Sequence, residues 1–406
     1  MKQSRVVVTG MGILSSNASS APEFADALRA GRSGIRDITQ FDTAFPFKLG
    51  GEVDVDGADS ELDRVSQLAA YAGRQALADS KLDTSAGWRE ETGLCIGTSR
   101  GPAISLERLL GTTCEVTSKA LFNEIPFHSI ARNVGRILGL SGPMTTVTMA
   151  CVSSSLAIGQ AFDSIRRGRA KVMLAGGADS LTNLSFSGFS LLRAMTRSVC
   201  RPFDARRDGI ILGEGAGILV LEDLEHARAR GAHIYAEIGG WGTAGDAHHA
   251  TSPSPDGRGL TLAIRNALKQ AKIAPDEIEH VNLHGTGTAT NDASESQAMH
   301  RVFGTRASSI PVNSLKPMFG HTLGAAGVLE LAGTILSMKG GFVAPTLNTE
   351  HLDPACDLNV VRGESLMLGY GTLLSTKSAF GGANVAIAAR NYVEPSAAHA
   401  ISQRSN

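Results

Sequence analysis

The chain of 406 residues has few cysteines, few aromatic residues and almost no net charge. Its five cysteines, at positions 95, 114, 151, 200 and 356, are odd in number, widely spaced and free of a CxxC pair. This pattern disfavours a disulfide framework or a zinc site and favours a reducing compartment. The formal net charge of −1 provides no overall field that would attract nucleic acid.

Long hydrophobic runs are also missing from the sequence, so we expect no membrane span. The apolar stretch near the N-terminus is broken by Thr9 and Gly10, which is the pattern of a first strand and turn rather than of a signal peptide. Together with the cysteine pattern, this predicts a cytoplasmic protein.

Glycine is abundant, at 46 residues, and short apolar strands alternate with amphipathic helices. This alternation predicts an α/β fold. A second series of the same kind begins near residue 235, which favours two similar halves packed together. We place these halves at 1–240 and 241–393, and we expect the small, polar segment 394–406 to be a frayed tail.

The first candidate for chemistry is Cys151, which lies between a predicted strand at 144–149 and a predicted helix that ends at Gly168. A cysteine in such a turn faces the free N–H groups and the positive dipole end of the helix, and both stabilise a thiolate. A lone cysteine is also commonly a buried, inert residue. On this stretch alone the two interpretations are equally favoured.

The second candidate is His284, which ends an apolar strand and precedes a Gly-Thr-Gly-Thr loop. The strand would fix the ring, and the hydroxyls of Thr286 and Thr288 suit a ligand that carries amides. A histidine that is simply satisfied at a strand end is equally favoured. Asp292 and Glu295, three residues apart, match the pattern of a helix N-terminal cap, and we assign them no acid–base role.

Two further segments carry single candidates. Lys316 and His321 flank a turn before a helix of small residues, although a solvated loop lysine and a packed histidine are the commoner cases. Phe380 precedes two glycines, which indicates either a gate or oxyanion loop, or a tight turn into the last strand.

Taken together and in this order, the motifs resemble those of the β-ketoacyl-acyl carrier protein synthases of the thiolase superfamily. They are TMACVSSSLAIG, RPFDARRDGIILGEGAGILVLE, GDAHHATSPSPDG, HGTGT, LKPMFGHTLGAAG and FGGAN, and they span nearly the whole chain. The resemblance implies the thiolase fold, with two pseudo-duplicated halves in five α-β-α-β-α layers. The first half would carry the cysteine, and the second would carry the two histidines and the lysine.

The resemblance also implies a reaction, the decarboxylative condensation of a malonyl-acyl carrier protein with an acyl chain held on Cys151 as a thioester. His284 and His321, as neutral imidazoles, would hydrogen-bond the enolate oxygen. Lys316 would orient His321 and its surroundings, and Glu330 would hold Lys316 by charge. This chemistry implies no metal and no organic cofactor.

Further roles follow from the resemblance. The backbone N–H groups of Cys151 and Phe380 would form the oxyanion hole, with Phe380 as a gate. Thr251, Thr286 and Thr288 would contact the pantetheine arm. Phe189 and Arg100 would line the acyl pocket, and Arg193 would contact the carrier protein.

Some positions depart from the family pattern. Ala379 and Ala383 replace a Gly and a Thr of the glycine-rich motif, and Ala289 replaces a Pro. Arg100 is unusual for a saturated fatty-acyl tunnel and suggests a changed pocket or an altered subunit partner. A type II polyketide or polyene pathway therefore fits at least as well as fatty-acid synthesis. The partner would be an identical subunit or a chain-length-factor homologue.

Three other classes of protein are alternatives. A non-catalytic subunit of the chain-length-factor type is the alternative function, and the presence of Cys151 with both histidines argues against it. A papain-like hydrolase would carry its own signature around the cysteine, which this sequence does not have. A degradative thiolase would need a second cysteine near the C-terminal glycine-rich loop, and 357–406 contains none.

Overall fold

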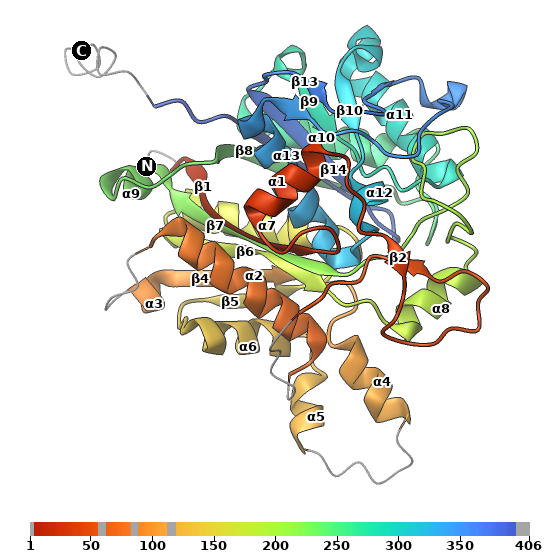
Figure 1. Cartoon of the computed structure of the whole chain (residues 1–406). Helices are drawn as coiled ribbons and strands as arrows, with labels where there is room; N and C mark the ends of the chain where they lie inside the picture. Colours follow the sequence, from red (N-terminus) through yellow and green to blue (C-terminus); the bar gives the residue numbers. More distant parts are fainter. Residues whose placement is uncertain (1–3, 56–61, 83–87, 112–118, 395–406) are drawn as a thin grey trace, which may run out of the picture.

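The computed structural model describes residues 4–55, 62–82, 88–111 and 119–394 (Figure 1). Cys114 lies outside these residues. The segment expected to be a frayed tail also lies outside them, apart from residue 394. The helices are α1 Ala21–Arg29, α2 Arg64–Ser80, α3 Trp88–Glu91, α4 Ala103–Gly111, α5 Lys119–Glu124, α6 Ser129–Leu138, α7 Ser153–Arg166, α8 Asn183–Leu191, α9 Leu224–Ala229, α10 Arg258–Ala271, α11 Ala289–Phe303, α12 Lys316–Phe319 and α13 Ala326–Gly340.

The strands come from both ends and the middle of the chain. They are β1 Val6–Ser15, β2 Arg36–Asp37, β3 Leu49–Gly50, β4 Thr92–Gly97, β5 Met144–Val147, β6 Val172–Asp179, β7 Gly215–Asp223, β8 Ala236–Gly245, β9 His280–Asn282, β10 Pro311–Asn313, β11 Phe342–Val343, β12 Asn359–Val360, β13 Leu366–Met367, β14 Thr372–Ser378 and β15 Ala383–Arg390.

Strand order reveals an internal duplication. The large sheet runs β12-β10-β9-β14-β15-β8-β1-β7-β6-β4-β5. From the edge inward, the strands of the first half are β5-β4-β6-β7-β1. Their successive pairings are parallel, parallel, antiparallel and antiparallel. The strands of the second half, β10-β9-β14-β15-β8, have the same four pairings in the same order. The two halves join where β1 and β8 pair over three residues. The expected boundary at 240/241 falls within β8, the first strand of the second half.

Helices cover both halves and separate them. Helix α2 packs on one face of β1, β6 and β7, and α10 packs on β8 and β15, whereas α7 and α13 contact strands of both halves. From one outer face to the other, the five layers are therefore α2 with α6, the first half-sheet, α7 with α13, the second half-sheet, and α10 with α11. This is the five-layered thiolase arrangement, as expected.

Small residues allow the two central helices to approach closely. A Cβ on Gly327 of α13 would lie 2.2 Å from the hydroxyl oxygen of Ser155 on α7. The Ser154 hydroxyl accepts a hydrogen bond from the Val328 N–H at 3.0 Å. The triple serine that follows Cys151 thus joins the two helices. Because the pseudo-symmetry relates β5–α7 to β10–α13, it also brings the segments that carry Cys151 and His321 to equivalent places.

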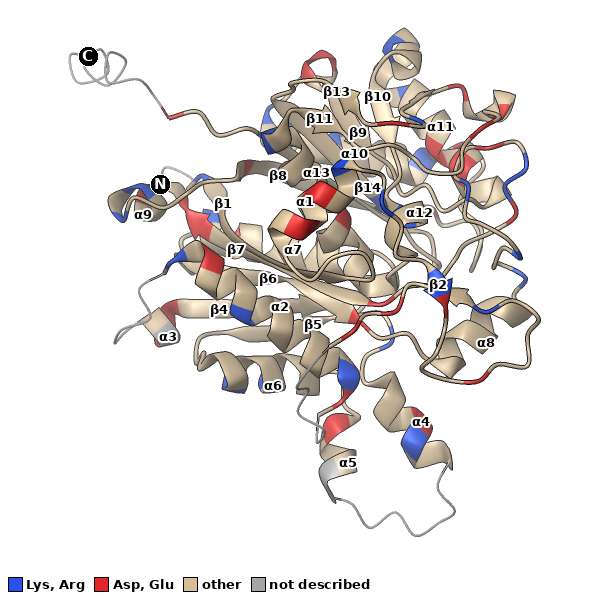
Figure 2. Cartoon of the chain, viewed as in Figure 1, with Lys and Arg blue, Asp and Glu red and all other residues tan. Residues whose placement is uncertain are grey.

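Charged residues of both signs are interspersed along the helices and loops (Figure 2). Strands β4 and β5 contain no charged residue, and β6 contains only Asp179, its last residue. Among the described residues, no helix is long and apolar enough to cross a membrane.

Candidate active site

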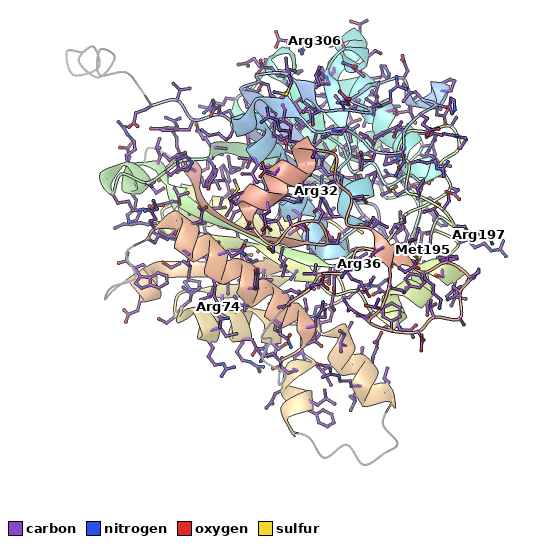
Figure 3. All side chains as sticks on the ribbon, viewed as in Figure 1. Arg32, Arg36, Arg74, Met195, Arg197 and Arg306 are labelled. Atoms are coloured by element: carbon purple, nitrogen blue, oxygen red, sulfur yellow. The ribbon has the colours of Figure 1, made fainter. Side chains whose placement is uncertain are left out.

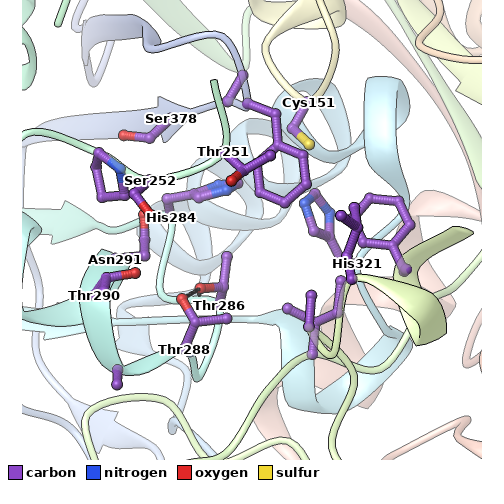
Figure 4. A pocket seen from close by; sticks show the side chains of 18 of the residues that line it. Cys151, Thr251, Ser252, His284, Thr286, Thr288, Thr290, Asn291, His321 and Ser378 are labelled. Atoms are coloured by element: carbon purple, nitrogen blue, oxygen red, sulfur yellow. Dashed lines mark hydrogen bonds between the residues drawn. The ribbon is translucent and has the colours of Figure 1, made fainter. Parts of the chain in front are cut away.

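Cys151 lies in the turn between β5 and α7, two residues before the helix begins. The preceding Ala150 adopts a φ of 45°, a left-handed conformation that is uncommon for a residue with a Cβ. The Ser153 hydroxyl stabilises this turn, because it donates to the Ala150 carbonyl at 2.7 Å and accepts from the Met149 N–H at 2.8 Å. The strained turn directs the sulfur toward the cavity described below (Figure 4).

Burial decides the ionisation of this thiol. Cys151 is only 6% exposed, and the loss of hydration raises the pKa of its thiol to about 12. The positive charges of Lys316 and Arg100 act in the opposite direction but do not compensate. The N–H of Cys151 also lowers this pKa, which is the direction expected at a helix terminus, but burial outweighs it and favours the neutral thiol.

Two imidazoles from the second half lie beside each other. His284 follows β9, and His321 lies between α12 and α13, after Gly320 with a φ of 82°. The centroids of the two rings are 5.2 Å apart and the ring planes are nearly perpendicular, at 82°. The packed-histidine alternative does not describe this pair, because both rings line the same cavity as Cys151 (Figure 4).

Both imidazoles are neutral at ordinary pH. Burial is the main cause that lowers the pKa of each ring well below 6.5, and the positive charge of Lys316 adds to it. The Leu323 N–H donates to Nδ1 of His321 at 3.3 Å, so the neutral ring carries its proton on Nε2. His321 thus presents a hydrogen-bond donor rather than a charge.

Lys316 is buried, so the alternative of a solvated loop lysine is wrong. Its side chain is 1% exposed, and its ammonium donates to the His284 carbonyl and, at 2.6 Å, to Glu330 of α13. Lys316 and Glu330 do not line the cavity themselves. They hold the backbone of His284 from behind.

The segment around His284 is anchored by two buried carboxylates. Glu295 accepts from the N–H groups of His284 and Gly285, at 2.7 and 2.6 Å, and Asp292 accepts from the N–H groups of Thr286 and Gly287. Both carboxylates lie within α11, whose N-cap is Thr288. The prediction that they cap this helix is therefore wrong, because they bind the preceding loop instead.

A cavity of about 350 Å³ joins the candidates. Of the residues predicted from the sequence, its lining contains Cys151, Phe189, Arg193, Thr251, His284, Thr286, Thr288, His321 and Phe380. Ser252, Asn291 and Ser378 contribute further polar side chains (Figure 4). The hydroxyls of Thr286 and Thr288 lie 2.9 Å apart. Nothing in the sequence around Asn291 and Ser378 marks them as site residues. They line the cavity only because the fold places them beside it.

Aromatic rings lie at one side of this cavity. Phe380 is 38% exposed, and its ring centroid lies 5.6 Å from that of Phe189. The guanidinium of Arg100 lies 5.6 Å above the Phe189 ring, although Arg100 is not among the residues that line the cavity. Ala379 takes part in a turn with Gly382, which donates to the Ala379 carbonyl at 3.0 Å. Its methyl packs against the hydrophobic core.

Two buried charged residues of this region were missed from the sequence. Asp179, at the end of β6, accepts from the N–H groups of Ser99, Arg100 and Gly324, at 2.8, 3.0 and 2.6 Å. It thereby ties the loop after β4 to the segment after His321. The other is Lys377 of β14, a lysine among hydroxyl residues in the strand that precedes the glycine-rich motif. Its position in that strand was the only available signal.

Comparison with known proteins agrees with this geometry. The family model for the β-ketoacyl synthase N-terminal domain matches residues 3–227, and the model for the C-terminal domain matches residues 235–350. The chain therefore belongs to the β-ketoacyl synthase family. Members of this family are condensing enzymes, and the chain shares their thiolase fold.

Relatives along the whole chain come from two groups. The ketoacyl synthase alpha subunit of the tetracenomycin polyketide synthase of Streptomyces glaucescens is 39% identical, over 94% of this chain and 95% of that one. The 3-oxoacyl-[acyl-carrier-protein] synthase 2 of Synechocystis sp. is 38% identical, over 97% and 99%.

Similar solved structures belong to ketosynthase assemblies. The ishigamide ketosynthase/chain length factor has a TM-score of 0.92 at 36% identity, covering 96% of this chain and all of that chain. A type II polyketide ketosynthase bound to the hexaketide, in complex with its acyl-carrier protein, has a TM-score of 0.91 at 32% identity, with the same coverage.

Proposed function

We propose that this protein condenses a malonyl-acyl carrier protein with an acyl chain held on Cys151, releasing CO2 and giving a β-ketoacyl-acyl carrier protein. One observation carries the proposal. A thiol and two neutral imidazoles, contributed by three separate segments, line one cavity. Loading and condensation would both take place there.

In the loading step, the Cys151 sulfur bonds to the carbonyl carbon of the incoming thioester. The carrier's thiol leaves and takes the thiol proton, so the exchange is balanced. The N–H groups of Cys151 and Phe380 would hydrogen-bond the oxyanion of the tetrahedral intermediate. The Phe380 N–H is available for this role, since it donates to no described residue.

In the condensation step, the malonyl thioester loses CO2 and its electron pair passes to an enolate. His284 and His321 would donate hydrogen bonds to the enolate oxygen, as neutral donors held in place. The enolate carbon then attacks the acyl carbonyl, the bond to Cys151 breaks, and the sulfur is reprotonated. The loss of CO2 drives bond formation, so this scheme uses no metal or organic cofactor.

Substrate delivery would involve the cavity mouth. The hydroxyls of Thr251, Thr286 and Thr288 suit the amides of a phosphopantetheine arm. Arg193 also lines the cavity, and Arg197 projects away from the body of the protein beyond α8 (Figure 3). Arg193 is exposed, and an exposed arginine in the cavity lining suits the acidic surface that we expect of a carrier protein.

We also propose a partner subunit, either a second copy or a chain-length-factor homologue. Strand β5 forms one edge of the sheet, and Met144 and Met149 next to it are 37% and 46% exposed. Phe127 and Phe122 nearby in sequence are also exposed. A subunit on this edge would cover apolar surface beside Cys151. The pathway would be type II polyketide, polyene or fatty-acid synthesis.

The cytoplasm is the compartment that we propose. The four described cysteines, Cys95, Cys151, Cys200 and Cys356, are all free, which suits a reducing environment.

The decisive test supplies an acyl thioester and a malonyl-acyl carrier protein. Intact-mass measurement should find the acyl group on Cys151, and the product should carry a new β-keto group. Cys151→Ala should abolish both, whereas Cys95→Ala, a matched change in the core, should preserve both. Elongation by the Cys151→Ala variant would refute the proposal.

A further inference from the structure

A second lysine lies buried behind the site. Lys377 is on the same face of β14 as Leu373 and Ser375, the face that packs against α13, and its side chain is 1% exposed. A lysine is almost never fully buried unless its charge is paired. The mechanism above makes no use of this residue.

The ammonium of Lys377 has a complete set of acceptors. It lies 2.9 Å from Oε2 of Glu330 and 2.8 Å from Oδ1 of Asn282. It also donates to the Thr376 carbonyl at 2.7 Å and contacts the Ser375 hydroxyl at 3.2 Å. An ammonium has three donors, so every one is engaged.

One carboxylate bridges the two buried lysines. Glu330 is fully buried, and it offers Oε1 to Lys316 and Oε2 to Lys377. Lys316 in turn donates to the His284 carbonyl. Lys377 therefore reaches the His284 backbone through Glu330 and Lys316.

A second connection runs through β9. Asn282, the last residue of β9, lies two positions before His284 and pairs with Ser375 of β14. Lys377 binds its side-chain oxygen directly. The segment that carries His284 is thus held from both sides, at Asn282 and at the His284 carbonyl, and both attachments include Lys377.

We propose that Lys377 is a positioning residue for the condensation step, holding the Lys316–Glu330 pair and the end of β9 so that His284 faces the substrate carbonyl. This inference rests on the proposed function. It concerns condensation, because the polar partners given for Lys377 among the described residues belong to β9, β14 and α13 and none to the Cys151 turn.

The surroundings of Lys377 also give it a pH dependence. Burial is the largest cause that lowers the pKa of its ammonium to about 8, with Glu330 acting in the opposite direction and Lys316 in the same direction. Glu295 of α11 acts with Glu330, and the nearby imidazoles of His284 and His321 are neutral.

On the other face of β14, α10 carries its charged side chains in solvent: Arg258, Arg265 and Lys269. Above about pH 8 the Lys377 ammonium loses its charge, and its hold on Glu330 weakens.

The experiment separates the two half-reactions. Acyl loading of Cys151 is followed by intact mass, and condensation is followed in a single turnover of pre-acylated enzyme with malonyl-acyl carrier protein, each between pH 6 and 9.5. In the wild type, condensation should decline above about pH 8 and loading should show no such decline. In Lys377→Met, condensation at pH 7 should fall at least about tenfold with loading unchanged within about twofold, and the decline should vanish.

Controls make each outcome informative. Lys269→Met, an exposed lysine on α10, should behave as the wild type. If Lys377→Met does not fold, Lys377→Gln keeps a donor toward Glu330, and the decline above pH 8 should still vanish. Equal losses of loading and condensation, or a decline that persists in these variants, would overturn the inference. A wild type that loads but never condenses would instead overturn the proposed function.

Discussion

The rings of His284 and His321 meet edge to face, with centroids 5.2 Å apart, and each residue is only 3% exposed. At this distance two imidazolium charges would repel strongly, and the buried lysines behind the rings add to the cost. Both rings are therefore uncharged, and His321 presents its Nε2–H as a hydrogen-bond donor. Both rings are neutral before substrate binds.

This state makes stability depend on pH. Folding lowers the pKa of both rings well below the 6.5 of the unfolded chain, so the unfolded state binds more protons under mild acid. The contribution is fully present above about pH 6.5 and is lost as the pH falls toward the folded-state values. Between pH 6.5 and 5.5 the two rings should cost up to about 2 kcal/mol of unfolding free energy.

Urea unfolding at pH 7.5, 6.5 and 5.5 measures this loss. Between pH 6.5 and 5.5 the variants His284→Asn and His321→Asn should each lose about 1 kcal/mol less unfolding free energy than the wild type. His248→Asn, an exposed histidine, should follow the wild type. Identical acid sensitivity in all four proteins would contradict the assignment.

Alkylation of Cys151 tests the state of the thiol. Since burial raises the pKa of this group to about 12, the rate of iodoacetamide labelling at Cys151 should climb about tenfold per pH unit from 7 to 10, with no plateau near pH 8.5. Peptide mapping by mass spectrometry gives the rate, with free N-acetylcysteine as reference. A plateau near pH 7 would mean that the helix terminus, not burial, controls the thiol.

Glu330 should be essential for stability. Glu330→Gln leaves Lys316 and Lys377 buried without a counter-charge, and breaking such a buried arrangement costs about 3–5 kcal/mol. The denaturant midpoint should fall accordingly, whereas Glu364→Gln, an exposed change, should have little effect. A Glu330→Gln variant as stable as the wild type would show that the buried charges are compensated elsewhere.

Local sequence patterns were enough to predict much of the fold and the principal side chains. The strand, turn and helix around Cys151 appear as β5, its turn and α7, and the duplication appears as a repeated strand order. Each histidine follows a strand or turn signal. Their convergence does not follow from any local pattern, because it arises when the two halves stack face to face around α7 and α13.

Features that depend on long-range packing could not be read from the sequence. The spacing of Asp292 and Glu295 is that of a helix cap, and only the fold brings the His284 loop against them. A lysine such as Lys377, among hydroxyl residues in a strand, reads as solvent-facing until Glu330 is placed opposite it. The pKa of Cys151 likewise depends on how much protein covers the turn, which no short window encodes.

The last prediction concerns chain selectivity. The guanidinium of Arg100 and the ring centroid of Phe380 each lie 5.6 Å from the ring centroid of Phe189. Asp179 holds the Arg100 backbone, so the side chain starts from a fixed point. Arg100 is exposed and lies outside the cavity lining, so we expect it to disfavour only an acyl chain long enough to pass Phe189, because such a chain would desolvate the guanidinium.

Arg100→Leu replaces this charge with apolar surface. The ratio of kcat/KM for an octanoyl thioester to that for an acetyl thioester should rise about tenfold, which corresponds to about 1.4 kcal/mol, whereas Arg100→Lys should leave the ratio near that of the wild type. Competition between the two acyl donors for Cys151, read by intact mass, gives the ratio directly and is insensitive to the amount of active enzyme. An unchanged ratio in Arg100→Leu would place the determinant of chain length elsewhere. The partner subunit proposed for the β5 edge would then be the next surface to change, since Met149 is exposed beside Cys151.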